Sequence, residues 1–125
     1  MCGNSNNCLV NILEKIILLQ RSSDNSTLGC DKPFLGNILQ SANTRPINLY
    51  SCCTNTLWEI PYDFNGTTGV SSFFRIENIN ENCATFRILI FNDDGSYTST
   101  DNFFTINLNC IGSIKCLGDA LVNIL

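Results

Sequence analysis

Cysteine is the residue type in this chain whose chemistry is easiest to anticipate. The 125 residues include eight cysteines, which are Cys2, Cys8, Cys30, Cys52, Cys53, Cys83, Cys110 and Cys116. A thiol can bind a metal ion, act as a nucleophile or form a disulfide. The spacing of these residues helps to separate the three possibilities.

The spacing argues against a metal site and against a redox-active pair. Structural zinc sites usually combine close C-x2-C pairs, often with histidines. Here five residues separate Cys2 from Cys8, and Cys52 adjoins Cys53. The chain has no C-x-x-C motif and no histidine, so neither a thioredoxin-like site nor a cysteine–histidine pair is expected. We therefore predict no catalytic, cofactor-binding or metal-binding residue, and no enzyme activity.

The remaining chemistry is disulfide formation, for which all eight cysteines are candidates. On one regular strand the Cα atoms of Cys110 and Cys116 would lie about 20 Å apart, whereas a disulfide needs roughly 4.4–6.8 Å. Each of these two either pairs elsewhere or acts as a small buried apolar residue. Cys52 and Cys53 would point to opposite faces of a strand, one inward and one exposed. Cys2 lies in a polar arm and is the first candidate for a link between molecules.

Hydrophobic periodicity predicts the elements that position the cysteines. Residues 1–7 are expected to form a flexible arm, and residues 8–125 a single cysteine-rich β domain. An amphipathic helix is predicted over residues 8–20. Its apolar face would carry Leu9, Ile12, Leu13, Ile16 and Ile17. Leu18 falls on the polar face, where it is either a lone exposed leucine or an interface contact.

Strand patterns follow the helix. Candidate strands cover residues 46–53, 57–62, 71–79 and 84–91, with turns at 65–66 and 94–95. The strands over 71–79 and 84–91 are expected to form a hairpin. Its inner face would carry Phe74, Ile76, Phe86, Ile88 and Ile90.

Two further expectations concern the outer face of this hairpin and the last strand. Arg75, Glu77 and Arg87 would share the outer face, with Glu77 opposite Arg87. A long period-two pattern from Phe104 to Cys116 predicts one strand that bends at Gly112. The expected fold is mainly β, a single-domain β-sandwich or open barrel with one N-terminal helix.

Composition narrows the class of partner. The net charge is −4 and the pI is near 4.5, so no basic field exists for nucleic acid or anionic lipid. Only 14% of residues are charged, which weakens repulsion between copies and suits self-association. The longest apolar run, residues 16–19, is too short to span a membrane. The N-terminal residues do not form a secretory signal, so synthesis in a cytosol is expected, with thiols oxidised later.

Several blocks of the chain resemble a Bacillus spore coat and exosporium family that includes CotY, CotZ and ExsY. The blocks are CLVNILEKIILLQ (8–20), GCDKPFLG (29–36), ANTRPINLY (42–50), FFRIENINENCATFRILI (73–90) and FTINLNCIGSIKCLGD (104–119). The PFLG and NTRP pieces are the most specific. Cysteines at the family's positions are Cys8, Cys30, Cys83, Cys110 and Cys116. Cys52 and Cys53 depart from its pattern.

The resemblance implies a structural protein of the outer spore layer, whether exosporium, coat or crust. It implies self-assembly into a two-dimensional lattice cross-linked by disulfides, with itself and other spore coat proteins as partners and no cofactor. It also implies synthesis in the mother-cell cytosol and oxidation around assembly. The alternative is a disulfide-rich binding or anchoring module on a surface, and an enzyme with a catalytic thiol is the least favoured interpretation because histidine is absent.

Overall fold

A computed structural model of the chain describes residues 7–24 and 42–122. Cys2, Cys30 and the segment 29–36 lie outside the described residues. In chain order the elements are α1 (Asn7–Asp24), β1 (Ile47–Ser51), β2 (Ile60–Phe64), β3 (Thr67–Ser71), β4 (Phe73–Asn80), β5 (Cys83–Phe91), β6 (Tyr97–Asn107), the 3₁₀ helix η1 (Leu108–Cys110) and β7 (Ile111–Cys116).

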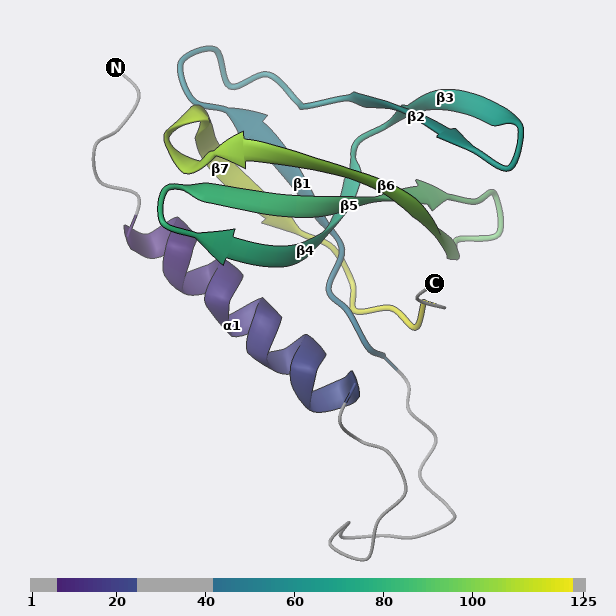
Figure 1. Ribbon diagram of the computed structural model, residues 1–125, viewed down its shortest axis with the longest axis horizontal. Coiled ribbons are helices and arrows are strands. Elements are labelled where there is room, and N and C mark those ends of the chain that lie inside the picture. Colours follow the sequence, from purple (N-terminus) through teal and green to yellow (C-terminus); the bar gives the residue numbers. More distant parts are fainter. Residues whose placement is uncertain (1–6, 25–41, 123–125) are drawn as a thin grey trace, which may run out of the picture.

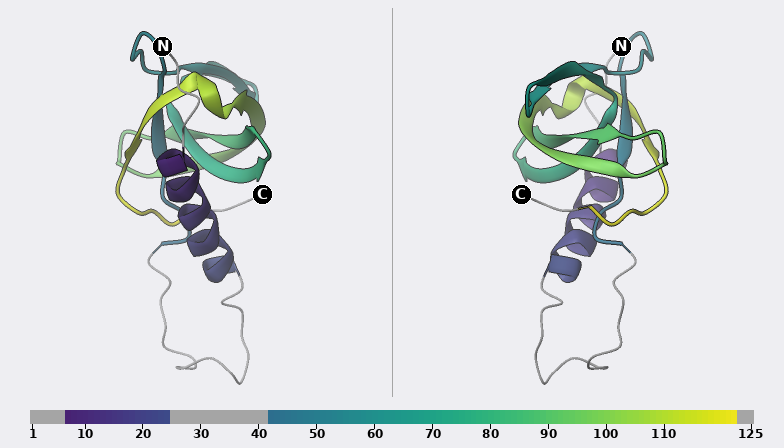
Figure 2. Two further views of the ribbon diagram at one scale, coloured as in Figure 1. Left: turned by 90° about the vertical axis from the view of Figure 1, so that its left-hand side faces the viewer. Right: turned by 90° about the vertical axis from the view of Figure 1, so that its right-hand side faces the viewer.

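Five strands form one antiparallel sheet in the order β6-β5-β4-β1-β7, while β2 and β3 form a separate hairpin. The sheet is strongly curved but not closed, and α1 lies against it on the side opposite the β2–β3 hairpin (Figures 1 and 2). The prediction of a mainly β fold with one N-terminal helix is therefore confirmed.

The helix covers the predicted residues and continues to Asp24. Leu13, Ile16 and Ile17 are buried against the sheet. Ile12 was expected on the same face but is 39% exposed, because the buried stripe is centred on Leu13 and Ile16 and Ile12 falls at its margin. Leu18 is 61% exposed, as its position on the polar face predicted.

One buried glutamine joins the helix to the sheet. The side chain of Gln20 is almost fully buried; its Nε2 donates to the carbonyl oxygen of Ile76 at 2.8 Å, and its Oε1 accepts from Thr44 Oγ1 at 2.5 Å. Ile76 lies beyond the point where β1 pairs with β4 at Ile47 and Phe74. Ile76 pairs with Phe86 on β5, and β1 no longer pairs with β4 at this point, so the amide of Gln20 satisfies a carbonyl of β4 that has no partner on β1.

The hairpin of β4 and β5 is confirmed, but its predicted register is wrong. Ile79 pairs with Ala84 rather than with Thr85, and Arg75 pairs directly with Arg87. Two features cause the difference. The turn is only two residues long, with Glu81 in the left-handed conformation (φ 57°), and an irregularity at Glu77 shifts the pairing by one residue.

The expected outer face of this hairpin is not solvent-exposed. Arg75 is 4% exposed and Arg87 is 7% exposed. Glu77 Oε2 accepts from Arg75 Nη1 at 2.6 Å and from Arg87 Nε at 2.9 Å. Arg87 also donates to the carbonyl oxygen of Thr100 at 2.7 Å, and its guanidinium lies 4.4 Å from the centre of the Phe103 ring. One carboxylate therefore separates two buried cations that face each other across the sheet.

The β2–β3 hairpin is only partly predicted. Its turn falls at Asn65 and Gly66, whose φ angles of 53° and 77° are those of a tight hairpin turn. The strand predicted over 57–62 is β2, shifted to residues 60–64, but β3 carries no clear alternation and was missed. Reciprocal hydrogen bonds between Asp63 and Asn102 tie this hairpin to β6.

The predicted last strand is in fact two strands. The chain turns through η1 after Asn107, so that β6 and β7 form opposite edges of the sheet. Leu108 points into the core with 1% exposure. The predicted bend at Gly112 is instead a close crossing, because a Cβ there would lie 2.7 Å from Cys52 Cα and 2.8 Å from the Ser51 carbonyl oxygen.

The chain after β7 is tied back to the residues before β1. Thr44 and Ala120 form an isolated bridge, and Arg45 makes a two-point ion pair with Asp119 at 2.6 and 3.1 Å. The hydrogen bond from Arg45 holds the pKa of Asp119 below its ordinary value.

Replacing Asp119 by Asn should destabilise the protein by about 0.5–1 kcal/mol at neutral pH, because the pair is partly exposed. A carboxyl whose pKa is lowered by folding stabilises the protein above its unfolded pKa of about 3.8 and loses that contribution as the pH falls through the folded value. Urea unfolding under reducing conditions should therefore show a larger loss of unfolding free energy for the variant at pH 7 than at pH 2.5. An equal deficit at both values would contradict this account, and Asp93→Asn on an exposed turn is the matched control.

Candidate cross-linking site

Four free cysteines fall among the described residues, and all four are exposed. They are Cys8, Cys83, Cys110 and Cys116. The alternative in which Cys110 and Cys116 act as buried apolar residues is therefore wrong. Cys52 and Cys53 are not among these free thiols. They follow β1 on a turn rather than lying on a strand, because β1 ends at Ser51; Cys52 is half-buried and Cys53 exposed.

Cys83 is placed by the tight turn between β4 and β5. It is the first residue of β5 and pairs with Asn80 across the turn and with Asn107 on β6. The carbonyl oxygen of Asn82 accepts from the backbone N–H of Leu108 at 2.7 Å. This hydrogen bond holds the turn against η1. The backbone of Cys83 is therefore paired on both sides, with β4 and with β6.

Cys110 is placed by η1 itself. The side chain of Asn107 caps this short helix by accepting from the backbone N–H of Asn109 at 2.8 Å. The carbonyl oxygen of Cys110 accepts from the backbone N–H of Cys52 at 2.9 Å. Three loops that are distant in sequence, those that carry Cys52, Cys83 and Cys110, are therefore joined by backbone hydrogen bonds.

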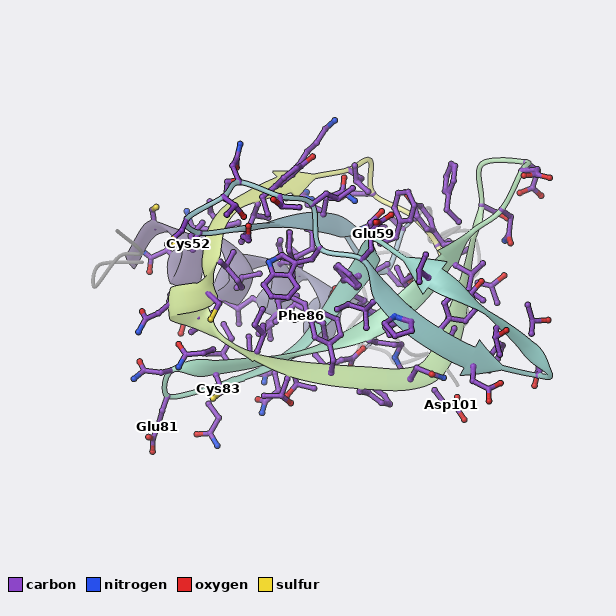
Figure 3. All side chains as sticks on the ribbon, turned by 90° about the horizontal axis from the view of Figure 1, so that it is seen from above. Cys52, Glu59, Glu81, Cys83, Phe86 and Asp101 are labelled. Carbon is purple, nitrogen blue, oxygen red and sulfur yellow. The ribbon has the colours of Figure 1, made fainter. Side chains whose placement is uncertain are left out.

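These loops lie at one end of the molecule. Figure 1 shows the start of α1, the β4–β5 turn, η1 and the turn after β1 on the same side of the structure. Cys52, Glu81 and Cys83 mark this end in Figure 3. We call it the thiol end, defined by the exposed free thiols of Cys8, Cys83 and Cys110. The sequence pattern gave no sign of this convergence, because it depends on the turn through η1.

Cys116 stands apart from the thiol end. It closes β7 and pairs with Ile47, the first residue of β1. Five residue steps along a strand separate it from Ile111 at the other end of β7, which corresponds to about 16 Å. The six-residue spacing from Cys110 thus keeps the two thiols apart, as the sequence argument predicted, although η1 interrupts the strand.

The exposed thiols allow one kind of chemistry without rearrangement of the core. Two thiols that meet can form an S–S bond by losing two protons and two electrons to an oxidant, such as a low-molecular-weight disulfide that is reduced to two thiols. Among residues 7–24 and 42–122, no three Cys, Asp or Glu side chains gather in a way that could hold a metal ion.

Comparison with known proteins places the chain in a family. The family described as spore coat protein Z matches residues 2–102, which is most of the chain. The chain belongs to this spore coat family. The match ends before Cys110, so the resemblance of the block 104–119 stays a prediction. No curated protein and no solved structure matches the chain.

Membership in the spore coat family makes the chain a structural protein of the spore coat. The expected location on the spore surface and interaction with other coat proteins follow from the same membership. None of the helices in the described part of the chain has the length and hydrophobicity needed to cross a membrane.

Proposed function

We propose that the protein assembles with copies of itself into a two-dimensional layer of the outer spore surface, and that disulfides between subunits lock this layer. The single observation that carries the proposal is the exposure of all four described free thiols. Free cysteines are among the most buried residue types. Four exposed free cysteines in a domain whose core is filled by other side chains therefore indicate a role other than core packing.

The placement of the thiols supports a role between molecules. Cys83 and Cys110 lie on short, hydrogen-bonded loops at one end, whereas Cys116 lies elsewhere on the surface. A subunit that carries thiols in two directions can link to more than one neighbour, which a layer requires. Cys2 and Cys30 lie outside the described residues, and we retain Cys2 as the first candidate for an intermolecular link.

The protein purified alone should form ordered sheets or closed shells. Negative-stain microscopy and size-exclusion chromatography of reduced and oxidised samples test this expectation. Assembly in both samples, with covalent multimers only after oxidation, would support the proposal. A monodisperse monomer at high concentration in both samples would contradict it and favour a surface binding or anchoring module.

A further inference from the structure

Exposed acidic and basic side chains are unevenly distributed over the described part of the chain, although Glu14 lies beside Lys15 on α1. Residues 46–74 and 88–114 contain no lysine or arginine, yet they carry Glu59, Asp63, Asp93, Asp94 and Asp101. Buried Arg75 and Arg87 contact Glu77, and Arg45 is paired with Asp119. Among the described residues, the cations left on the surface are Lys15 and Arg21 on α1 and Lys115 on β7.

The acidic region includes a groove with an exposed aromatic side chain. The groove lies between the β2–β3 hairpin and the end of β5, where it is lined by Glu59, Val70 and Phe91 among others. Val70 is 62% exposed and Phe91 is 48% exposed. The Phe91 ring stacks on Phe73 at 5.0 Å and contacts Tyr97 at 5.2 Å, so its position is fixed before any partner arrives. We call this the aromatic groove.

Two further carboxylates lie on the turn next to the aromatic groove. The turn beside Phe91 carries Asp93 and Asp94, and Ser96 donates to Asp94 through both its hydroxyl and its backbone N–H, at 2.6 and 2.9 Å. These hydrogen bonds hold the pKa of Asp94 below its ordinary value. The groove and the turn beside it therefore combine apolar side chains with carboxylates, and hydrogen bonds favour the charged form of Asp94.

The outer surface of α1 has the opposite combination. Leu18 is 61% exposed, Leu19 is 52% exposed and Ile12 is 39% exposed, and Lys15 lies between them on the helix surface. Arg21 follows one turn after Ile17 on the flank of the helix. We call this set the helix surface. Its exposed side chains are apolar, like those of the aromatic groove. Lys15 and Arg21 outweigh one exposed carboxylate on the same helix, Glu14, so the helix surface carries a net positive charge, opposite to that of the groove.

We propose that the helix surface of one copy docks in the aromatic groove of a second copy. The two surfaces belong to different parts of the molecule, so the contact is head-to-tail and repeats from copy to copy, closing into a ring or extending as a row. This inference rests on the proposed self-assembly and names the surfaces that produce it. Charge complementarity selects the partner and the orientation, while burial of the leucines and Phe91 supplies affinity.

Charge reversal on each surface tests the contact. The first variant, Lys15→Glu/Arg21→Glu, has two acidic surfaces, and the second, Glu59→Lys/Asp93→Lys, has two basic ones. In reducing buffer at low salt, each variant alone should need at least about tenfold more protein than wild type to assemble, as measured by light scattering. An equimolar mixture should assemble near the wild-type concentration, because every helix then meets a groove of opposite charge.

The outcomes separate the docking contact from self-assembly itself. Lys115→Glu, which reverses an exposed cation on β7 outside both surfaces, is the control and should assemble like wild type. Circular dichroism checks that each variant is folded. Wild-type behaviour of both reversed variants, or a mixture that stays dispersed while wild type assembles, would overturn the docking contact and leave self-assembly intact. If wild type itself fails to assemble in reduced and oxidised samples, the proposed function is wrong and this contact falls with it.

Discussion

Replacing Glu77 by Gln should lower the stability of the isolated subunit by about 3 kcal/mol and its melting temperature by about 10 °C. Arg75 and Arg87 face each other across β4 and β5, and both donate to the same oxygen of Glu77. Glutamine retains the size of the side chain and can still accept one of these bonds, but it removes the negative charge that both buried cations contact. The variant therefore measures the effect of the negative charge on stability separately from the effect of side-chain packing.

Glu59→Gln is the matched control for this substitution. Glu59 is exposed on the segment before β2 and faces neither arginine, so its neutralisation should change stability by less than about 0.5 kcal/mol. Both variants are compared by thermal and urea unfolding under reducing conditions, at concentrations where no assembly occurs. Equal stability of Glu77→Gln and wild type would mean that the two arginines do not depend on this carboxylate.

The contacts around Glu77 also show how far the sequence could predict the structure. Alternation correctly identified β4 and β5 and placed Phe74, Ile76, Phe86 and Ile88 inside, because period-two patterning reports directly on one buried face. Proximity of Glu77 and Arg87 was predicted as well. The register was wrong because it depends on the turn length and on the irregularity at Glu77, neither of which has a pattern in the apolar residues.

The prediction of one continuous strand from Phe104 to Cys116 was wrong for a different reason. Its apolar residues keep a period of two through η1, although the backbone turns there and Leu108 enters the core from the turn. The available signal was the pair of asparagines around Leu108, since asparagine side chains readily cap turns, as Asn107 does. Without that turn, nothing in the sequence places Cys110 beside Cys52 and close to Cys83.

The fixed positions of the exposed thiols indicate whether disulfides direct the assembly of subunits or only stabilise an assembly that has already formed. A disulfide forms where two Cα atoms are already held within about 7 Å. Thiols on fixed loops, such as those of Cys83 and Cys110, can meet a partner only if another contact first orients the two subunits. Non-covalent surfaces such as α1 and the aromatic groove therefore act before oxidation, and assembly geometry should be independent of the cysteines.

Replacing the four exposed thiols by serine, in the variant Cys8→Ser/Cys83→Ser/Cys110→Ser/Cys116→Ser, should leave the layer intact but fragile. Each substitution lies on the surface and should cost less than about 0.5 kcal/mol. The same arrays should appear by microscopy, whereas resistance to denaturant after oxidation should fall sharply, because a covalent link raises the effective concentration of a broken contact to about millimolar.

Two further variants complete this test. Replacement of all eight cysteines should abolish the ladder of covalent multimers on a gel run without reductant. Cys2→Ser alone should weaken the multimer bands if Cys2 forms an intermolecular disulfide. An unchanged ladder with Cys2→Ser would assign the link to other cysteines, with Cys83 and Cys110 next. If the fourfold variant keeps its circular dichroism spectrum but forms no array under the oxidising conditions in which wild type does, the disulfides direct assembly, and the order of events argued here is reversed.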